Sequence, residues 1–311
     1  MEGRGKEELP NSYIGPIAKT VAVYLKYHVK VSDRDIHRLF ESLFSLKMST
    51  GSIMGFRDQL QRYCQPMYEQ LLKSLKNSSF IHADETGWRL DGKKHWLWNF
   101  SNHSISISHI DPGRGQAVVD QMLGSQYDGI LISDFLSAYN KIKTKGKQKC
   151  LVHLLRELKR IQEALWDDPS VQSFCQRLKE LLKDAIELAK AYQDQAISKE
   201  DFERKRTRLE ESLKDLTYAD PHHKILQRLV KRLNQYRGEL LTFLYHPGID
   251  SNNNHAERQI RPNVLLRKIT FGNRSYQGTE NHNVLMSVIQ TAKLQNLNPM
   301  EFLQNWLFSF D

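Results

Sequence analysis

The first 79 residues carry the spacing of apolar positions that is typical of helices. Apolar residues recur every three or four positions over residues 36–44, and Ser32 stands before them as a suitable helix cap. Ser49 precedes a second such stretch in the same way. Because proline has no backbone N–H, we expect Pro66 to separate this second helix from a third that ends near Lys76.

Residues 80–152 change to the shorter period of strands. The runs FIHADET, HWLWNF and SISISHI are rich in aromatic and β-branched residues, and turn residues such as Asp91-Gly92 separate them. We expect the last two runs to form a hairpin, residues 116–123 to form a short helix, and GILISD and then KCLV to add strands. This order predicts an α/β fold with a mixed sheet that helices cover.

Residues 154–246 are helical in pattern almost throughout. Helix starts are predicted at Asp168-Pro169, at Ser198 and at Asp220-Pro221. After an Asn-rich loop, residues 255–268 and 281–294 again have a helical pattern. The chain is therefore expected to divide into an N-terminal helical region (1–79), two parts of one catalytic domain (80–153 and 247–311), and a helical insertion between them (154–246).

Composition and charge narrow the class of protein. The chain has 45 Lys and Arg against 36 Asp and Glu, a formal net charge of +9, which favours a polyanionic partner such as nucleic acid. No apolar run is long enough to span a membrane, and the N-terminus lacks the apolar core of a secretory signal. Three cysteines are too few for a disulfide framework, which indicates a reducing compartment.

Three acidic residues stand where a catalytic metal site could form. Asp84 and Asp134 follow apolar strands, and Glu257 opens a helix after the Asn-rich loop. Carboxylates at strand ends point into the crevice where α/β proteins bind ligands, and carboxylate oxygens suit Mg²⁺. Two such ions can activate a nucleophile and stabilise a leaving oxygen in phosphoryl transfer. The alternative is that these acids are turn formers and helix-end charges.

Several sequence motifs resemble those of one known family. The carrying motifs are HADETGW at 82–88, SDFLSAY at 133–139, and NNHAERQIRP followed by RKITFGN within 253–273. SYIGP at 12–16, STGSI at 49–53 and TAKLQNLNP at 291–299 add to them. Together they resemble the transposase of the insertion-sequence sixty-six family over about residues 12 to 305.

The resemblance implies a fold, a reaction and a set of partners. It implies a ribonuclease H-like sheet flanked by helices, with Asp84, Asp134 and Glu257 as the acidic triad. We expect two Mg²⁺ (or Mn²⁺) ions in each active site, and cleavage and strand transfer at transposon ends. DNA ends and target DNA are the expected partners of a homodimer or higher multimer, with accessory proteins an open question. The expected location is the bacterial cytoplasm, on the chromosome.

The family's usual N-terminal coiled coil and zinc module are expected to be missing here. The insertion at 154–246 is expected to contact DNA or another subunit, and its alternative is a structural appendage.

Basic residues cluster near the second and third acids. Their number fits contact with DNA phosphates, which makes binding strongly salt-dependent; the alternative is a solvated surface. After Asp134 the lysines alternate along one segment, and around Glu257 the arginines share faces of a helix. The predicted DNA-binding residues are Lys141, Lys143, Lys145, Arg258, Arg261, Arg267, Lys268 and Arg274, with Lys147 and Lys149 continuing the alternation.

Three further residues are candidates for support of the active site. The resemblance includes the cysteine and histidine of Cys150-Leu-Val-His153, which could shape the active site, although a structural zinc site needs four ligands. The alternative is a buried cysteine and a histidine at the start of a helix. His82 is expected to share the strand face of Asp84, where it could orient a carboxylate or pack in the core.

The tryptophans and one tyrosine leave alternatives open. Trp96 and Trp98 are expected in the core, while Trp88 could lie there or stack on a base. A tyrosine recombinase would instead use Tyr276 with an H-x-x-R pair, such as His153–Arg156 or His255–Arg258, and no metal. A transposase-derived protein that binds DNA without catalysis is the second alternative.

Overall fold

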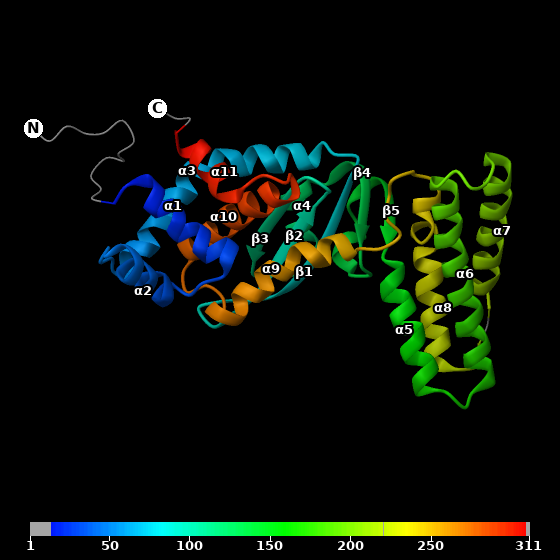
Figure 1. The fold of residues 1–311 in the computed structure, drawn as a ribbon. Helices are drawn as coiled ribbons and strands as arrows, with labels where there is room; N and C mark the ends of the chain where they lie inside the picture. Colours follow the sequence, from blue (N-terminus) through cyan, green and yellow to red (C-terminus); the bar gives the residue numbers. More distant parts are fainter. Residues whose placement is uncertain (1–13, 220, 309–311) are drawn as a thin grey trace, which may run out of the picture. The chain divides into compact units, whose positions relative to one another are not determined.

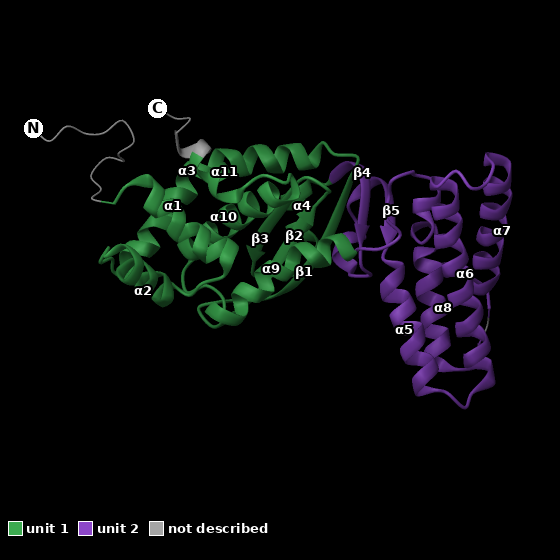
Figure 2. Cartoon of the chain, in the orientation of Figure 1, with its two compact units in different colours: residues 1–125, 254–311 green, residues 126–253 purple. Residues whose placement is uncertain are grey.

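The chain folds into two compact units, each built from helices and strands (Figure 1, Figure 2). The computed structural model describes residues 14–219 and 221–308. Unit 1 takes the described residues of 1–125 and 254–311, and unit 2 takes residues 126–253. The predicted α/β class is confirmed. The first two residues of the SYIGP motif and Asp220 lie outside the described residues, and the division at 79, 153 and 246 stays a prediction.

The N-terminal helices of unit 1 begin where the sequence places their caps. They are α1 (Pro16–Tyr24), a π-helical turn (Leu25–Val29), α2 (Asp33–Phe44) and α3 (Thr50–Lys76). The Ser32 hydroxyl accepts the N–H of Asp35 at 3.1 Å, and the Ser49 hydroxyl accepts that of Ser52 at 3.0 Å. Both bonds satisfy N–H groups that a helix leaves open in its first turn, so both predicted caps are confirmed.

The predicted break at Pro66 is wrong, because α3 continues through it to Lys76. Pro66 is exposed, so its ring meets solvent rather than a packed neighbour. Buried residues on either side of it, among them Leu60, Cys64 and Met67, form one continuous face of α3 that packs against the rest of unit 1. Tertiary packing thus outweighs the missing backbone hydrogen bond.

Three antiparallel strands form the sheet of unit 1, in the order β3-β2-β1. They are β1 (Phe80–Leu90), β2 (Lys93–Ser101) and β3 (Ser106–Asp111), and the predicted β2–β3 hairpin is confirmed. Asp91 and Gly92 join β1 to β2 with φ of 49° and 71°. Two consecutive positive φ values match the twist of a two-residue hairpin, which carries β1 six residues beyond Asp84.

The long helix α10 (Tyr276–Leu294) runs along β3 and bonds to its backbone. The N–H groups of Ser106, Ser108 and Ile110 donate to side-chain oxygens of α10 at 3.1, 2.8 and 2.9 Å. The acceptors are Thr291, Ser287 and Asn283. Four helical residues rise about 6 Å and two strand residues rise about 6.6 Å, so the two repeats stay in step.

Helix α9 (Asn254–Thr270) packs on β1 and β2, and its Ile260 joins Trp88, Leu97 and Ile110 in one buried cluster. Helices α4 (Gln116–Leu123) and α11 (Pro299–Phe308) complete unit 1, and α4 has the bounds predicted for it. Among the described helices, none is both long enough and apolar enough to span a bilayer.

Unit 2 contains a parallel pair of strands followed by helices. Strand β4 (Gln126–Ser133) pairs with β5 (Lys143–Lys149), and two 3-10 turns (Arg237–Glu239 and Thr242–Leu244) follow the helices. A buried cluster that runs from Leu151 to Leu244 forms the core. The helices are α5 (Leu151–Ala164), α6 (Pro169–Gln193), α7 (Lys199–Thr217) and α8 (Lys224–Tyr236).

Two of the helix starts in unit 2 are confirmed and two details are wrong. Asp168 and Ser198 cap α6 and α7 as predicted. The third helix begins at Lys224, where the His223 Nδ1 accepts the N–H of Ile225, rather than at Pro221. KCLV is not a strand, because β5 ends at Lys149 and the residues after Cys150 open α5.

Candidate functional site

Asp84 lies in the middle of β1 and not at a strand end, because the β1–β2 hairpin extends the strand to Leu90. The residue is half-buried, pairs with Asn99 of β2, and its Oδ1 accepts the N–H of Glu85 at 3.0 Å. This bond fixes the carboxylate close to its own backbone. The remaining oxygen capacity of a carboxylate is suited to a hard cation.

Glu85, on the other face of β1, forms a charged pair that the sequence analysis did not single out. Its side chain is only 2% exposed, and both Nε and Nη2 of Arg114 donate to its Oε1, at 3.1 and 2.8 Å. The same guanidinium lies 4.2 Å from the ring centre of Trp96. Trp96 is half-exposed, contrary to its predicted place in the core, whereas Trp88 and Trp98 are buried.

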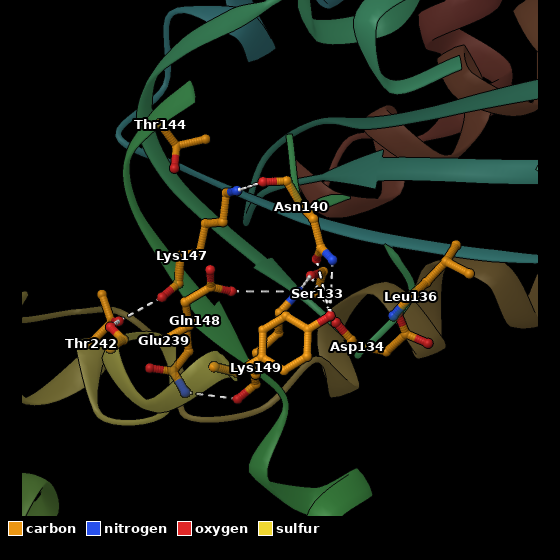
Figure 3. Close-up of polar contacts among 12 residues, drawn as sticks. Ser133, Asp134, Leu136, Asn140, Thr144, Lys147, Gln148, Lys149, Glu239 and Thr242 are labelled. Carbon is orange, nitrogen blue, oxygen red and sulfur yellow. Dashed lines mark hydrogen bonds and ion pairs between the residues drawn. The ribbon is translucent and has the colours of Figure 1, made fainter. Parts of the chain in front are cut away.

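Asp134 follows the last residue of β4, as predicted (Figure 3). Its Oδ1 accepts the N–H of Leu136 at 2.8 Å, a side-chain turn that holds the carboxylate at the carboxyl end of the strand. The hydroxyl of Ser133 donates to the Asp134 carbonyl at 3.0 Å. The β4–β5 register sets Ser133 opposite Lys149, so a lysine stands beside the residue that precedes Asp134.

Lys149 is buried and is not available to DNA, so its predicted role in phosphate contact is wrong (Figure 3). Its ammonium lies 3.6 Å from the Glu239 carboxylate, 3.3 Å from the Ser133 hydroxyl and 4.9 Å from the Tyr236 ring centre. Burial lowers the pKa of Lys149, while the charges of Glu239 and Asp134 act to raise it. A buried cation requires such partners.

Two of the partners of Lys149, Tyr236 and Glu239, come from the helical part of unit 2. Tyr236 ends α8 and Glu239 lies in the 3-10 turn after it. The Tyr236 hydroxyl and the Asn140 side chain form mutual hydrogen bonds at 3.0 and 3.2 Å. Lys147, which is half-buried, donates to the Asn140 carbonyl at 2.5 Å. These contacts fix Asn140 and Lys147, which lie near the two ends of the lysine-rich segment 141–149.

The other lysines of this segment face solvent. Lys141, Lys143 and Lys145 are exposed, and Lys143 and Lys145 stand on one face of β5. Their predicted contact with DNA stays a prediction.

Glu257 lies in the first turn of α9, is half-buried, and is carried by the helix that packs on β1 and β2. Arg258 and Arg261 are exposed on the same helix. Arg267 is half-buried, and its guanidinium donates to the Gly87 carbonyl in β1. Lys268 and Arg274, beyond it, are exposed.

His82 is buried among aromatic rings of unit 1. Its ring centre lies 5.1 Å from that of His255 in the first turn of α9 and 6.5 Å from that of His103. Burial, reinforced by His82 and His103, lowers the pKa of His255 to about 4. His255 is therefore neutral at pH 7, so one of the two H-x-x-R pairs has no charged histidine.

Cys150 and His153 stand at the start of α5 in unit 2. Cys150 occupies the N-cap position of the helix without a side-chain capping bond, is buried, and its Sγ accepts the N–H of Asn253 at 3.2 Å. His153 is half-buried one turn further along. Their predicted support of an active site stays a prediction.

The three acids are divided between the units. Asp84 and Glu257 belong to unit 1, and Asp134 belongs to unit 2 with Cys150 and His153. Over residues 14–219 and 221–308, no group of three or more histidines, cysteines or acids is arranged to hold a metal ion.

Comparison with known proteins identifies the family of the chain and a relative. The model of the Transposase IS66 family matches residues 12–281, a range that includes Asp84, Asp134 and Glu257. An uncharacterized protein of Sinorhizobium fredii, y4qI, is 26% identical over 326 aligned positions. The alignment covers 94% of this chain and 56% of that protein, so the chain spans little more than half the length of this relative.

Proposed function

Because the chain belongs to the IS66 transposase family, we propose that it cuts and joins DNA at transposon ends by metal-dependent transesterification. The family match carries this proposal, since it runs through all three motifs that contain the acids. In the proposed reaction, hydrolysis of a phosphodiester first frees a 3′-hydroxyl. That hydroxyl then attacks target DNA. Both steps are phosphoryl transfers, which metal ions held by carboxylates can catalyse.

We further propose a ribonuclease H-like catalytic fold. Its support is the order of elements, an antiparallel meander (β1–β3), a helix (α4) and a parallel strand pair (β4 and β5). In this proposal the three catalytic acids are Asp84 on β1, Asp134 after β4 and Glu257 on α9. The helices of residues 154–246 separate the second and third acids along the chain.

The donor chemistry of the three acids fits two Mg²⁺ or Mn²⁺ ions. Each acid is half-buried, and carboxylate oxygens are the ligands that such hard cations prefer. When bound, such ions would supply the Lewis acid that activates a nucleophile and stabilises the leaving oxygen. The chain itself orients two carboxylates through the N–H groups of Glu85 and Leu136.

Exposed cations would bind the DNA phosphates. They are Lys141, Lys143 and Lys145 in unit 2 and Arg258, Arg261, Lys268 and Arg274 in unit 1. Two transposon ends must be brought together, so we propose a homodimer or higher multimer on DNA. The proposed setting is the bacterial chromosome.

The first test is cleavage and strand transfer on a DNA substrate with Mg²⁺ or Mn²⁺. Wild type is compared with Asp84→Asn, Asp134→Asn, Glu257→Gln and Tyr276→Phe. We expect metal-dependent activity that falls at least 10²-fold in each acid variant and persists in Tyr276→Phe, because the acids bind the ions and the tyrosine does not react.

Two other outcomes would contradict the proposal. Activity without metal that disappears in Tyr276→Phe would indicate a tyrosine recombinase. DNA binding with no cleavage by any variant would indicate a transposase-derived binding protein.

A further inference from the structure

The loop between α9 and α10 (residues 271–275, here the Phe271 loop) is fixed to the end of β1. The Asn273 N–H donates to the Arg89 carbonyl at 2.9 Å, and the Asn273 carbonyl accepts the N–H of Asp91 at 2.8 Å. The Asn273 side chain accepts from the Trp88 indole at 2.7 Å and donates to the Gly278 carbonyl at 2.8 Å. A surface loop with this many bonds holds one conformation.

The loop contains two residues with left-handed backbone. Gly272 has φ of 106°, and a Cβ there would lie 2.2 Å from the Arg89 carbonyl oxygen, so only glycine fits. Phe271 has φ of 58°, at the position after a helix where glycine is usual. A bulky residue in this region costs conformational free energy.

Phe271 does not recover that cost by packing in unit 1. Phe271 is 80% exposed, and Tyr276 at the start of α10 is 79% exposed. Ile269, on the last turn of α9, is 41% exposed. Strained backbone that presents an aromatic ring to solvent suggests a ligand for that ring, since an exposed apolar group brings no stability.

The charge of the chain segment that carries these rings indicates the kind of ligand. From Arg258 to Thr279 the chain has five Lys and Arg and no Asp or Glu. Lys268 and Arg274, on either side of Phe271, are both exposed. An apolar protein partner would not need this excess of cations, whereas nucleic acid offers phosphates for the cations and base faces for the rings.

We propose that the Phe271 loop is a stacking surface for unpaired DNA bases, with Phe271 against a base and Lys268 and Arg274 on the flanking phosphates. Bases within a duplex are stacked on one another, so an aromatic face reaches a base only where the DNA is single-stranded or a base is flipped out. The proposal rests on the proposed function in that DNA is the substrate, and it concerns binding and not cleavage.

The test compares two DNA probes without metal ions. One is a duplex with a short unpaired overhang that carries 2-aminopurine, and the other is the same duplex fully paired. We expect Phe271→Gly to bind the overhang probe about tenfold more weakly than wild type and the paired duplex within twofold of wild type. The quenching of 2-aminopurine by wild type is expected to be lost as well.

The variants are chosen so that unfolding cannot explain the result. Glycine suits the left-handed backbone, so Phe271→Gly should be at least as stable as wild type. Phe271→Trp keeps a stacking ring and should retain binding. Phe44→Ala is the matched control, because Phe44 is an exposed phenylalanine (58%) on α2.

Equal binding of the overhang probe by wild type and Phe271→Gly would overturn the proposal. The proposal would also be overturned if Phe271→Gly lost a dimer in sedimentation while its DNA binding stayed unchanged, because the loop would then be a protein interface. A wild-type protein that does not prefer the overhang probe would overturn it too. A protein that stacks bases but does not cleave DNA would instead contradict the proposed function alone.

Discussion

At the residue scale, the buried His282 of α10 shows how packing sets a charge state. Its Nε2 lies 2.7 Å from the Asn263 side-chain oxygen, and its ring packs against those of Tyr27 and Trp88. Burial, with the nearby charges of Lys30 and Lys26, lowers the pKa of His282 to about 3. The residue is therefore neutral in the folded protein throughout the physiological range.

His282 should make unit 1 less stable in acid. Its pKa is near 6.5 when unfolded and lower when folded, so between these values the unfolded state binds more protons. The contribution is fully present above pH 6.5 and is lost as pH falls toward 3. We expect a loss of roughly 2 kcal/mol in the free energy of unfolding between pH 7 and pH 5 from this group.

Denaturant unfolding of wild type and His282→Gln at both pH values measures the contribution of His282 to the free energy of unfolding. The variant should be less stable at pH 7, and its change between pH 7 and pH 5 should be smaller by roughly the same 2 kcal/mol. An equal change in both proteins would mean that folding does not lower the pKa of His282.

Other residues show where reasoning from sequence stops. The alternation of lysines after Asp134 predicted one solvated face, but Lys149 pairs with Glu239, ninety residues later in the chain. Trp96 was expected in the core, but it is half-exposed and the guanidinium of Arg114 lies over its ring. The partners of Lys149 and Trp96 are distant from them in the sequence, so no local pattern of residues could predict these contacts. The strand-end position of Asp134, which is local, was predicted correctly.

At the scale of elements, local signals predicted most starts and packing decided the exceptions. Serine caps fixed the starts of α2, α3 and α7, because the cap bond joins residues three apart. Pro66 did not end α3, since buried contacts on both sides keep the helix whole. The bonds between α10 and β3 join residues more than 170 positions apart, and no sequence pattern indicated them.

Those bonds lead to a prediction for Ser287. Ser287→Ala removes the acceptor of the buried Ser108 N–H and leaves it without that partner, which typically costs about 1–3 kcal/mol. We expect a decrease of that size in the free energy of unfolding and faster hydrogen exchange at the Ser108 amide. Ser74→Ala, at an exposed position of α3, is the control and should change stability by less than about 0.5 kcal/mol. Similar effects of both substitutions would contradict the prediction.

At the scale of the whole molecule, the net charge of +9 bears on DNA affinity, but its distribution matters more than its sum. Lys149 contributes to the total while it is buried. The three exposed lysines Lys141, Lys143 and Lys145 stand close together in the chain. Each contact between a lysine and a phosphate releases a counterion from the DNA. Each such lysine should therefore make the slope of the plot of log affinity against log salt steeper by about one.

Changing Lys141, Lys143 and Lys145 to Gln should lower that slope by about three, and wild-type affinity should fall steeply between about 50 and 200 mM salt. The control changes the exposed lysines Lys47, Lys73 and Lys199, which removes the same charge elsewhere. Fluorescence anisotropy with a labelled duplex measures both slopes. If the two triple variants behave alike, total charge and not the β5 segment governs binding.

Unit 1 is discontinuous in the chain, and this has a consequence for its synthesis. Strand β3 leaves the ribosome early, but α10, which satisfies its backbone, follows only after residues 126–253 have been translated. At about 5–20 residues per second, that delay is on the order of ten seconds. Throughout it, β3 presents an open row of N–H groups that another nascent chain could pair with. The demand on chaperones should therefore fall on the half-made first unit, while unit 2 can complete its fold as an uninterrupted stretch of chain.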